Sequence, residues 1–576
     1  MNKWIIAFYI GLISFIAGIQ VSGQILGFIG FYTTWSAILL SIILAIVFYL
    51  WILRTSFDFL LEILSPPGGK QPNQLLNAFG FIAGAGLLVG LLLLPLIIWP
   101  YSGINNELTW DAGLYHLPKA AELVVSHTTW DLTIDYGEYP WGYESLIAFS
   151  LLFSSSGLLI GAAHALIVIL FAFSIFILAA RFTRLPRGVL FFAIAVIMCS
   201  FDIVRDFDSN PWWIFRILAF TIGKNDFHLA TTILTMLAFS PFGLRGKGIQ
   251  FSLSGMAVSS ALVLSTKPNG ALVVFFVWVI ALYSEISHVI EQHINVKIFL
   301  KKWIPAGLVI LTGVLWAIRN LIMTGRLVSE NALGIQQWSI LNNLSNPYFY
   351  NYLDIYFKYF LVVVLLTVVF TIFSKRFHWT ILVMLLVCSL SFIATPASGF
   401  FGSNQTPTQI AWRFGAYLVA FEVAIVLLMV DPLIKWFFDK SIKPIEFLIA
   451  AGMIGISSWF IYLNYPRVIP REENAIVLRD LYRTPVGVDG YYSAYDYIQK
   501  NIRDSVVWVE NGYPFYVFGP DLTNTVSRSR PADYIVYFQT PIIDEGGYPE
   551  TLASSEWNSE WHLIYEDSEG RVYQRK

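Results

Sequence analysis

Long apolar runs separated by short polar stretches occupy the chain up to about residue 465. Runs such as Phe79–Pro100 and Gly157–Ala180 are long enough to cross a hydrocarbon core, which takes roughly 20 helical residues. The pattern predicts about 13 membrane spans,. They cover residues 4–22, 32–53, 76–99, 146–180, 187–201, 226–242, 251–266, 270–287, 303–323, 353–374, 378–395, 412–430 and 445–464. The fourth is broken at Ser154-Ser155-Ser156-Gly157, which allows a surface helix followed by a true span.

The composition supports a membrane protein and excludes several other classes. Of 576 residues, 56% are hydrophobic and only 13% are charged, whereas soluble domains carry about 25% charged residues. A formal net charge of −2 provides no global basic field for nucleic acid. The two cysteines, Cys199 and Cys388, lie inside apolar runs, so a disulfide framework, a CxxC metal site and a cysteine nucleophile lack support.

The distribution of basic residues predicts the orientation of the chain. Lys and Arg concentrate in cytoplasmic loops, and with the N-terminus in the cytoplasm nearly every inner loop is basic. These loops contain Arg54, Lys70, Arg181, Arg184, Arg187, Arg245, Lys247, Lys297, Lys301, Lys302, Lys375, Arg376, Lys435, Lys440 and Lys443. An odd number of spans then places the C-terminal segment outside.

The final polar segment has a different pattern from the rest of the chain. Residues 466–576 contain strand-like runs at 505–510, 515–518 and 534–538, and a helix-like run at 493–502. We therefore predict a polytopic α-helical membrane domain over 1–465, with a large first outer loop at 100–145, and a small extracytoplasmic α/β domain over 466–576.

The first large outer loop contains Trp110-Asp111-Ala112 and Tyr115-His116 soon after a predicted span. A carboxylate partly desolvated by aromatic rings has a raised proton affinity and can act as a general base near neutral pH. Asp111 fits this description. The alternative is that Asp111 caps a short interfacial helix, with Trp110 and Tyr115 in the aromatic belt.

Two further residues of this loop carry candidate chemistry. His116 could orient Asp111, bind an acceptor or join a metal site, although most lone histidines do none of these. Glu144 begins the next apolar run, where a carboxylate is costly unless it is paired or faces water. We therefore rank Glu144 above the other acidic residues of the loop, Asp135 and Glu138.

Four other polar clusters fall on the same predicted face of the membrane. They are Lys224–His228, Thr266–Gly270, Arg319-Asn320 and Trp412–Phe414. Each alone is best explained as a snorkelling anchor, but together they suggest one water-lined cavity. Its cations Lys267, Arg319 and Arg413 could bind an anionic phosphate at the interface.

The motif Trp110-Asp111-Ala112-x-x-Tyr115-His116-Leu117-Pro118 resembles the first-loop signature of the GT-C superfamily of membrane glycosyltransferases. The likeness is to the branch with protein mannosyltransferases and aminoarabinose transferases. Supporting matches are Pro140-x-x-x-Glu144, Lys224-Asn225-Asp226, Thr266-Lys267-x-x-Gly270 and Trp316-x-x-Arg319-Asn320. They follow the expected order over most of the chain. The predicted outer α/β domain also fits this branch.

The resemblance implies a polyprenyl-phosphate-linked sugar donor, an inverting transfer to a glycan, lipid or protein acceptor, and Asp111 as the catalytic base. The chain departs from many relatives because Ala112 follows Asp111, so Asp226 is the candidate second acidic residue. After the ninth span it also has Thr324-Gly325-Arg326-Leu327 in place of a Gly-Asn-Pro-like turn. The other expected substrate-binding residues are Trp110, Tyr115, Asn225 and His228. The expected location is the bacterial plasma membrane.

Asp111, Glu144 and Asp226 would hold a divalent cation if they converged, but we expect no obligatory metal and no other cofactor. Two other functions stay open. A secondary transporter or lipid flippase should show broken helices or charged pairs near the bilayer midplane, whereas the mid-span positions here are almost purely apolar. A ligase or polymerase of the O-antigen type would also use lipid-linked glycans, but it lacks the first-loop motif.

Overall fold

The computed structural model describes most of the chain, and all structural statements below concern the described residues. They are 2–65, 74–104, 112–199 apart from 133, 135, 156, 158 and 184, then 223–243, 249–292, 296–327, 340–341, 369, 379–394, 415–440, 443–468, 493–510, 512, 514–519, 521–526, 531–538, 559–567 and 570–576.

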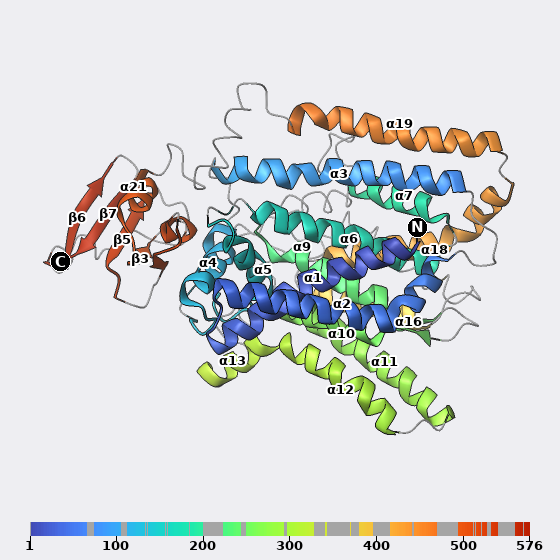
Figure 1. Ribbon diagram of the computed structural model, residues 1–576, viewed down its shortest axis with the longest axis horizontal. Coiled ribbons are helices and arrows are strands. Elements are labelled where there is room, and N and C mark those ends of the chain that lie inside the picture. The colour runs from blue at the N-terminus through green and yellow to red at the C-terminus, as the bar shows by residue number, and fades with distance from the viewer. Residues whose placement is uncertain are drawn as a thin grey trace.

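Long apolar helices form the main body of the molecule (Figure 1). Five helical stretches are long and apolar enough to cross a membrane: Asn2–Ile29, Thr34–Leu64, Gln74–Leu92, Ile160–Phe182 and Pro268–Ser287. A sixth results if Phe299–Thr312 and Leu315–Thr324, which meet at a bend of 56°, are counted as one span. The described helices thus support a membrane protein, while the predicted total of about 13 spans stays a prediction.

The helices follow the apolar runs of the sequence closely. Their bounds are α1 Asn2–Ile29, α2 Thr34–Leu64, α3 Gln74–Ile104, α5 Gly142–Leu151, α6 Ile160–Phe182, α7 Arg187–Cys199, α9 Asn225–Phe239, α10 Leu253–Thr266, α11 Ala271–Gln292, α12 Val296–Thr312, α13 Leu315–Thr324, α16 Trp379–Ile393, α18 Ala416–Lys440 and α19 Lys443–Val468. The predicted fourth span is two helices, α5 and α6, separated around Gly157, whose φ of 77° lies in the left-handed region that favours glycine,. Of the predicted span 353–374, only residue 369 is described.

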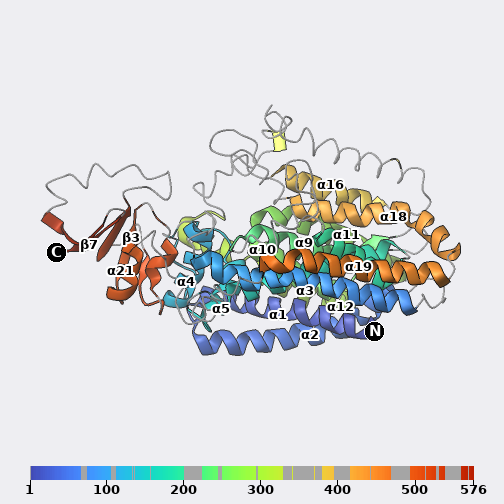
Figure 2. The same ribbon diagram turned by 90° about the horizontal axis from the view of Figure 1, so that it is seen from above.

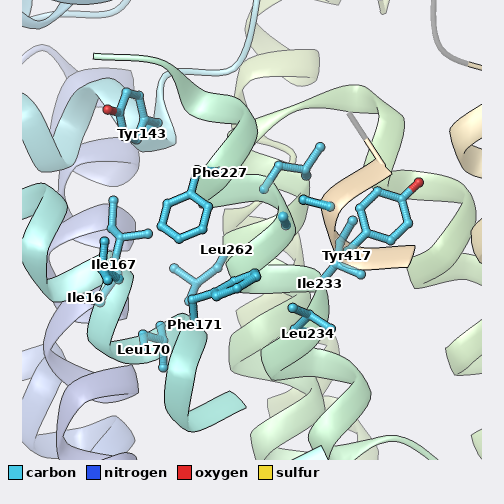
Figure 3. Close-up of a cluster of buried hydrophobic side chains, with 14 of the residues drawn as sticks. Ile16, Tyr143, Ile167, Leu170, Phe171, Phe227, Ile233, Leu234, Leu262 and Tyr417 are labelled. Atoms are coloured by element: carbon cyan, nitrogen blue, oxygen red, sulfur yellow. The ribbon is translucent and has the colours of Figure 1, made fainter. Parts of the chain in front are cut away.

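The bundle core is built where several helices meet (Figure 3). Phe171 and Phe227 pack with ring centroids 4.8 Å apart, which joins α6 to α9. Ile16 from α1 and Leu262 from α10 are fully buried in the same cluster. This packing fixes the ends of α9 and α10, and those ends carry two of the predicted polar clusters.

The first loop is partly helical. A π-helix, η1 (Ala112–His116), leads directly into α4 (Leu117–Ser126). Outside this loop, a short antiparallel strand pair, β1 (Phe242–Gly243) and β2 (Ile249–Gln250), follows α9. π-helices are rare and frequently occur at functional sites. The described part of the first-loop motif therefore begins with an unusual backbone conformation at Ala112–His116.

The C-terminal segment is a small mixed α/β unit, as predicted. Its sheet has the strand order β4-β3-β5-β7-β6, in which β3 pairs parallel with β4 and β5 while β7 pairs antiparallel with β5 and β6. The elements are α21 Ser493–Asn501, β3 Val506–Val509, η6 Pro514–Phe518, β4 Thr525–Val526, β5 Tyr534–Phe538, β6 Trp561–Glu566 and β7 Gly570–Arg575. The predicted strand at 515–518 is wrong, since Pro514 begins a 3₁₀ helix there, and proline favours the first position of a helix.

The C-terminal domain lies at one end of the helix bundle and the N-terminus lies toward the other (Figures 1 and 2). Both views place α4 and α5 at the end that faces this domain.

Candidate functional site

Four of the five predicted polar clusters are joined by contacts. The first-loop cluster lies on η1, α4 and α5, and the second begins α9. The third lies between α10 and α11, and the fourth is on α13. The fifth, Trp412–Phe414 with its predicted phosphate ligand Arg413, lies outside the described residues. The predicted base Asp111 and its neighbour Trp110 also lie outside them.

The centre of the first cluster is a buried charge network. Nδ1 of His116 lies 2.7 Å from Oε1 of Glu144, and Nζ of Lys119 lies 3.3 Å from the same oxygen. All three side chains are at most 1% exposed. Because an ionised carboxylate only accepts hydrogen bonds, Nδ1 of His116 carries the proton. His116 therefore binds Glu144 in this structure, and Glu144 has the partners that its position required.

Burial and pairing act in opposite directions on the ionisation of this network. Burial disfavours the charged form of Glu144, but Lys119 and the hydrogen bond from His116 outweigh it, and the pKa of Glu144 lies below its ordinary value. Burial lowers the pKa of Lys119 to about 8, although Glu144 opposes the shift. Lys119 also donates to the carbonyl of Pro140 over 3.1 Å. The network is thus a paired charge site sealed from solvent.

Aromatic rings connect the first cluster to the second. The ring of Tyr143 lies edge-on to His116 at 5.7 Å and tilted toward His228 at 5.6 Å. Its hydroxyl accepts a hydrogen bond of 3.1 Å from the backbone N–H of Gly223. Tyr115, the predicted substrate contact, packs on His116 at 4.1 Å and on Tyr136 at 4.3 Å. Tyr115 and Tyr143 therefore both contact His116, and Tyr143 links it to His228.

The second and third clusters form an ion pair. Nζ of Lys267 lies 2.6 Å from Oδ1 of Asp226, and the two side chains are 14% and 3% exposed. Asp226 sits in the first turn of α9, where the helix dipole favours an anion. Asn225 donates to the carbonyl of Thr266 over 3.3 Å. The ends of α9 and α10 are held together at this pair, and Lys267 is partly open to solvent.

Gln20, which lies outside the predicted polar clusters, completes this junction. Gln20 of α1 accepts a 2.7 Å hydrogen bond from Nε2 of His228 and donates to Ser265 and Thr266 over 2.7 Å and 3.1 Å. Because the amide of Gln20 donates to α10, its oxygen must be the acceptor from His228. Placing a glutamine inside an apolar span costs free energy unless its amide is hydrogen-bonded. This cost could have identified Gln20 from the sequence. His228 is fully buried in this contact, so its predicted substrate contact has no support in the geometry.

Arg319 makes contacts different from the phosphate contact expected of it. Its guanidinium donates to the carbonyls of Thr129 and Gly137 over 2.5 Å and 2.9 Å, and to Oδ1 of Asn320 over 2.8 Å. Asn320 in turn donates to the carbonyl of Glu138 over 2.7 Å. Arg319 is fully buried and ties α13 to the first loop, so its predicted phosphate contact has no support in the geometry.

The ring of Trp141 lies near two buried cations, Lys119 of the first loop and Arg319 of α13. Nζ of Lys119 lies 5.1 Å from the Trp141 ring centroid, and Cζ of Arg319 lies 5.8 Å from it. A tryptophan ring face attracts cations, and the indole N–H is occupied by the carbonyl of Gly137 at 2.7 Å. Trp141 therefore joins the Glu144 network to the Arg319 contacts.

Two buried oxygens of the site have acceptor capacity left. Oε2 of Glu144 and Oδ1 of Asn225 accept no hydrogen bond from the part of the chain that the structure describes. Groups that donate hydrogen bonds, such as hydroxyls, would satisfy them. In the same described ranges, no group of three or more His, Cys, Asp or Glu residues is arranged to hold a metal ion. Asp111 is not among those residues, so the expectation of no obligatory metal stays a prediction.

Comparison with known proteins adds no family to this picture. No protein-family model matches the chain, and no curated protein matches it.

Proposed function

We propose that this protein is an integral membrane glycosyltransferase of the GT-C type that moves a sugar from a polyprenyl-phosphate-linked donor to an extracytoplasmic acceptor. The observation that carries the proposal is the contiguity of four clusters that are far apart in the sequence. His116 contacts Tyr143, Tyr143 contacts His228, and His228 is linked to the end of α10 through Gln20. Such a polar site at one end of an apolar bundle suits a ligand that is half lipid and half sugar.

The residues divide the work of an inverting displacement. Asp111 takes the proton of the acceptor hydroxyl, whose oxygen attacks the anomeric carbon while the bond to the phosphate oxygen breaks. The electron pair of that bond leaves with the polyprenyl phosphate. Lys267, the partly exposed cation of the site, stabilises the departing phosphate together with Arg413.

The other side chains have supporting tasks. Oδ1 of Asn225, which is buried and open to a donor, accepts a hydrogen bond from a sugar hydroxyl. Tyr115 packs against the sugar face, and Asp226 holds Lys267 in place until the phosphate binds. His116 binds Glu144, and Arg319 donates to the carbonyl of Thr129. These two contacts hold the first loop in place.

The test is turnover of a synthetic polyprenyl-phosphate sugar by the purified full-length protein. The readout is the release of polyprenyl phosphate in the presence of an acceptor extract from bacterial envelopes. Loss of a general base costs roughly 10²–10⁴-fold in rate, so Asp111→Asn should fall by that factor. The matched control is Asp131→Asn, a change to another aspartate of the same loop, which should retain activity. Equal turnover in wild type and Asp111→Asn would remove Asp111 from the mechanism.

A second candidate, a lipid or glycan transporter, is favoured by one observation. α12 and α13 form a bent pair with an angle of 56°, and broken helices occur at transporter binding sites. At this break, however, Gly313 fits closely against Ala261, where a Cβ would approach the backbone oxygen to 2.6 Å. A flip assay in proteoliposomes separates the two functions, since a transferase leaves labelled lipid in its original leaflet when no acceptor is present.

A further inference from the structure

η1 follows directly after the predicted base and is too short to maintain its own conformation. A single π-helical turn is an irregular backbone that persists only where its surroundings impose it. Four of its five residues are buried: Ala112, Gly113, Leu114 and His116. The elements around η1 therefore set where the first-loop motif lies.

Two of those elements belong to the helix bundle. α5 holds His116 through Glu144 at 2.7 Å. Gly223, with a φ of +89°, lies so close that a Cβ on it would come within 2.5 Å of the Cβ of Ala112. These two contacts join η1 to residues of the helix bundle.

The third element comes from the other end of the chain. η6, the 3₁₀ helix Pro514–Phe518 of the C-terminal domain, packs against both η1 and α4, and β4 also contacts α4. All five residues of η6 are buried. The C-terminal domain lies beside α4 in both views (Figures 1 and 2).

η6 is itself held firmly by its own domain. The amide of Asn524, which is fully buried, donates to the carbonyl of Val517 over 2.9 Å and to that of Ile502 over 3.1 Å. Gln499 of α21 donates to the carbonyl of Tyr516 over 3.2 Å, and the Tyr516 ring packs on Tyr495 at 5.1 Å. η6 can therefore transmit the position of the whole domain to η1.

We infer that the C-terminal domain is a positioning part of the candidate site: η6 holds η1 and α4, and thereby sets the geometry of the first loop. Asn524 is the positioning residue of this contact, acting through η6. The inference concerns a contact and does not need the proposed chemistry, although its kinetic consequence rests on the proposed function.

The test is hydrogen exchange measured by mass spectrometry on the full-length protein in detergent micelles. Asn524→Ala should speed exchange in η6 and also in residues 112–126, by about tenfold, the factor that corresponds to about 1.4 kcal/mol of opening free energy. The matched control is Asn501→Ala, because Asn501 donates only within α21, to the carbonyl of Tyr497, and it should change neither region. If Asn524→Ala does not fold, Gln499→Ala gives the same readout with a milder change.

Faster exchange in η6 with unchanged exchange in residues 112–126 would overturn the inference. So would equal acceleration of residues 112–126 in the Asn501→Ala control. Turnover gives an independent readout: with the proposed function correct, Asn524→Ala lowers kcat and leaves the affinity for polyprenyl phosphate unchanged. If the proposed function fails, the exchange result still decides the inference.

Discussion

The two ion-paired clusters at this end of the bundle differ in one respect: their access to solvent. The Glu144 network, with His116 and Lys119, is at most 1% exposed. The Asp226–Lys267 pair leaves Lys267 14% exposed. A sealed pair stabilises its surroundings but cannot exchange partners with a ligand, whereas a cation at the rim can. By their exposure to solvent, we call the Glu144 network the inner cluster and the Asp226–Lys267 pair the outer pair. The difference suggests that the inner cluster holds the first loop and that the outer pair contacts the substrate.

The largest effect should come from breaking the inner network. Glu144→Leu leaves Lys119 as an uncompensated buried charge, which costs about 3–5 kcal/mol. The double variant Lys119→Met with Glu144→Leu should recover much of that loss, because no charge is then buried alone. Denaturant unfolding in mixed micelles measures both. A double variant less stable than Glu144→Leu would show that the network is not a coupled pair.

The pH dependence of stability distinguishes the two lysines. Burial lowers the folded-state pKa of Lys119 to about 8 from 10.5. Between these values the unfolded chain holds a proton that the folded chain has lost, so stability rises as pH rises from about 8 to 10.5. At 1.36 kcal/mol per pKa unit, a pKa difference of about 2.5 gives a rise of about 3–4 kcal/mol at most,. Lys119→Met should abolish this slope and Lys267→Met should retain it; an unchanged slope in Lys119→Met contradicts the assignment.

Arg319 should contribute to the stability of the protein, as the Glu144 network does, and not to substrate binding. Arg319→Lys keeps the charge but loses the planar fork that reaches Thr129, Gly137 and Asn320,. We expect a loss of about 2 kcal/mol, the scale of hydrogen bonds made by a charged group. Thermal unfolding in detergent checks this. Unchanged stability with weakened phosphate binding would restore the original role predicted for Arg319.

The outer pair should contribute least to stability. Lys267→Met leaves Asp226, which is 3% exposed, without its cation. Because Lys267 is 14% exposed, water can reach the carboxylate, and we expect a loss smaller than that of a sealed pair, which is about 3–5 kcal/mol,. Its melting temperature should therefore fall by less than that of Glu144→Leu. A loss as large as that of Glu144→Leu would show that Lys267 is as structural as the inner network.

The sequence predicted the helices well because apolar runs of helical length leave few alternatives for the backbone. It placed the break near Gly157 correctly. It expected Glu144 to be paired or to face water, since a lone buried carboxylate is costly, and Glu144 is paired. It did not identify Lys119 or Gln20 as partners, because their contacts join segments far apart in the chain. The strand expected at 515–518 failed because local β-propensity was outweighed by Pro514 and by packing against η1,.

The central claim, that the outer cation meets a lipid phosphate, is tested most directly by the affinity for polyprenyl phosphate without a sugar. Native mass spectrometry or a thermal-shift titration can compare wild type, Lys267→Met and Arg319→Lys. A charge-assisted contact contributes roughly 1.5–3 kcal/mol, so Lys267→Met should bind at least about tenfold more weakly, while Arg319→Lys binds as the wild type does. Equal affinity in wild type and Lys267→Met would contradict the account.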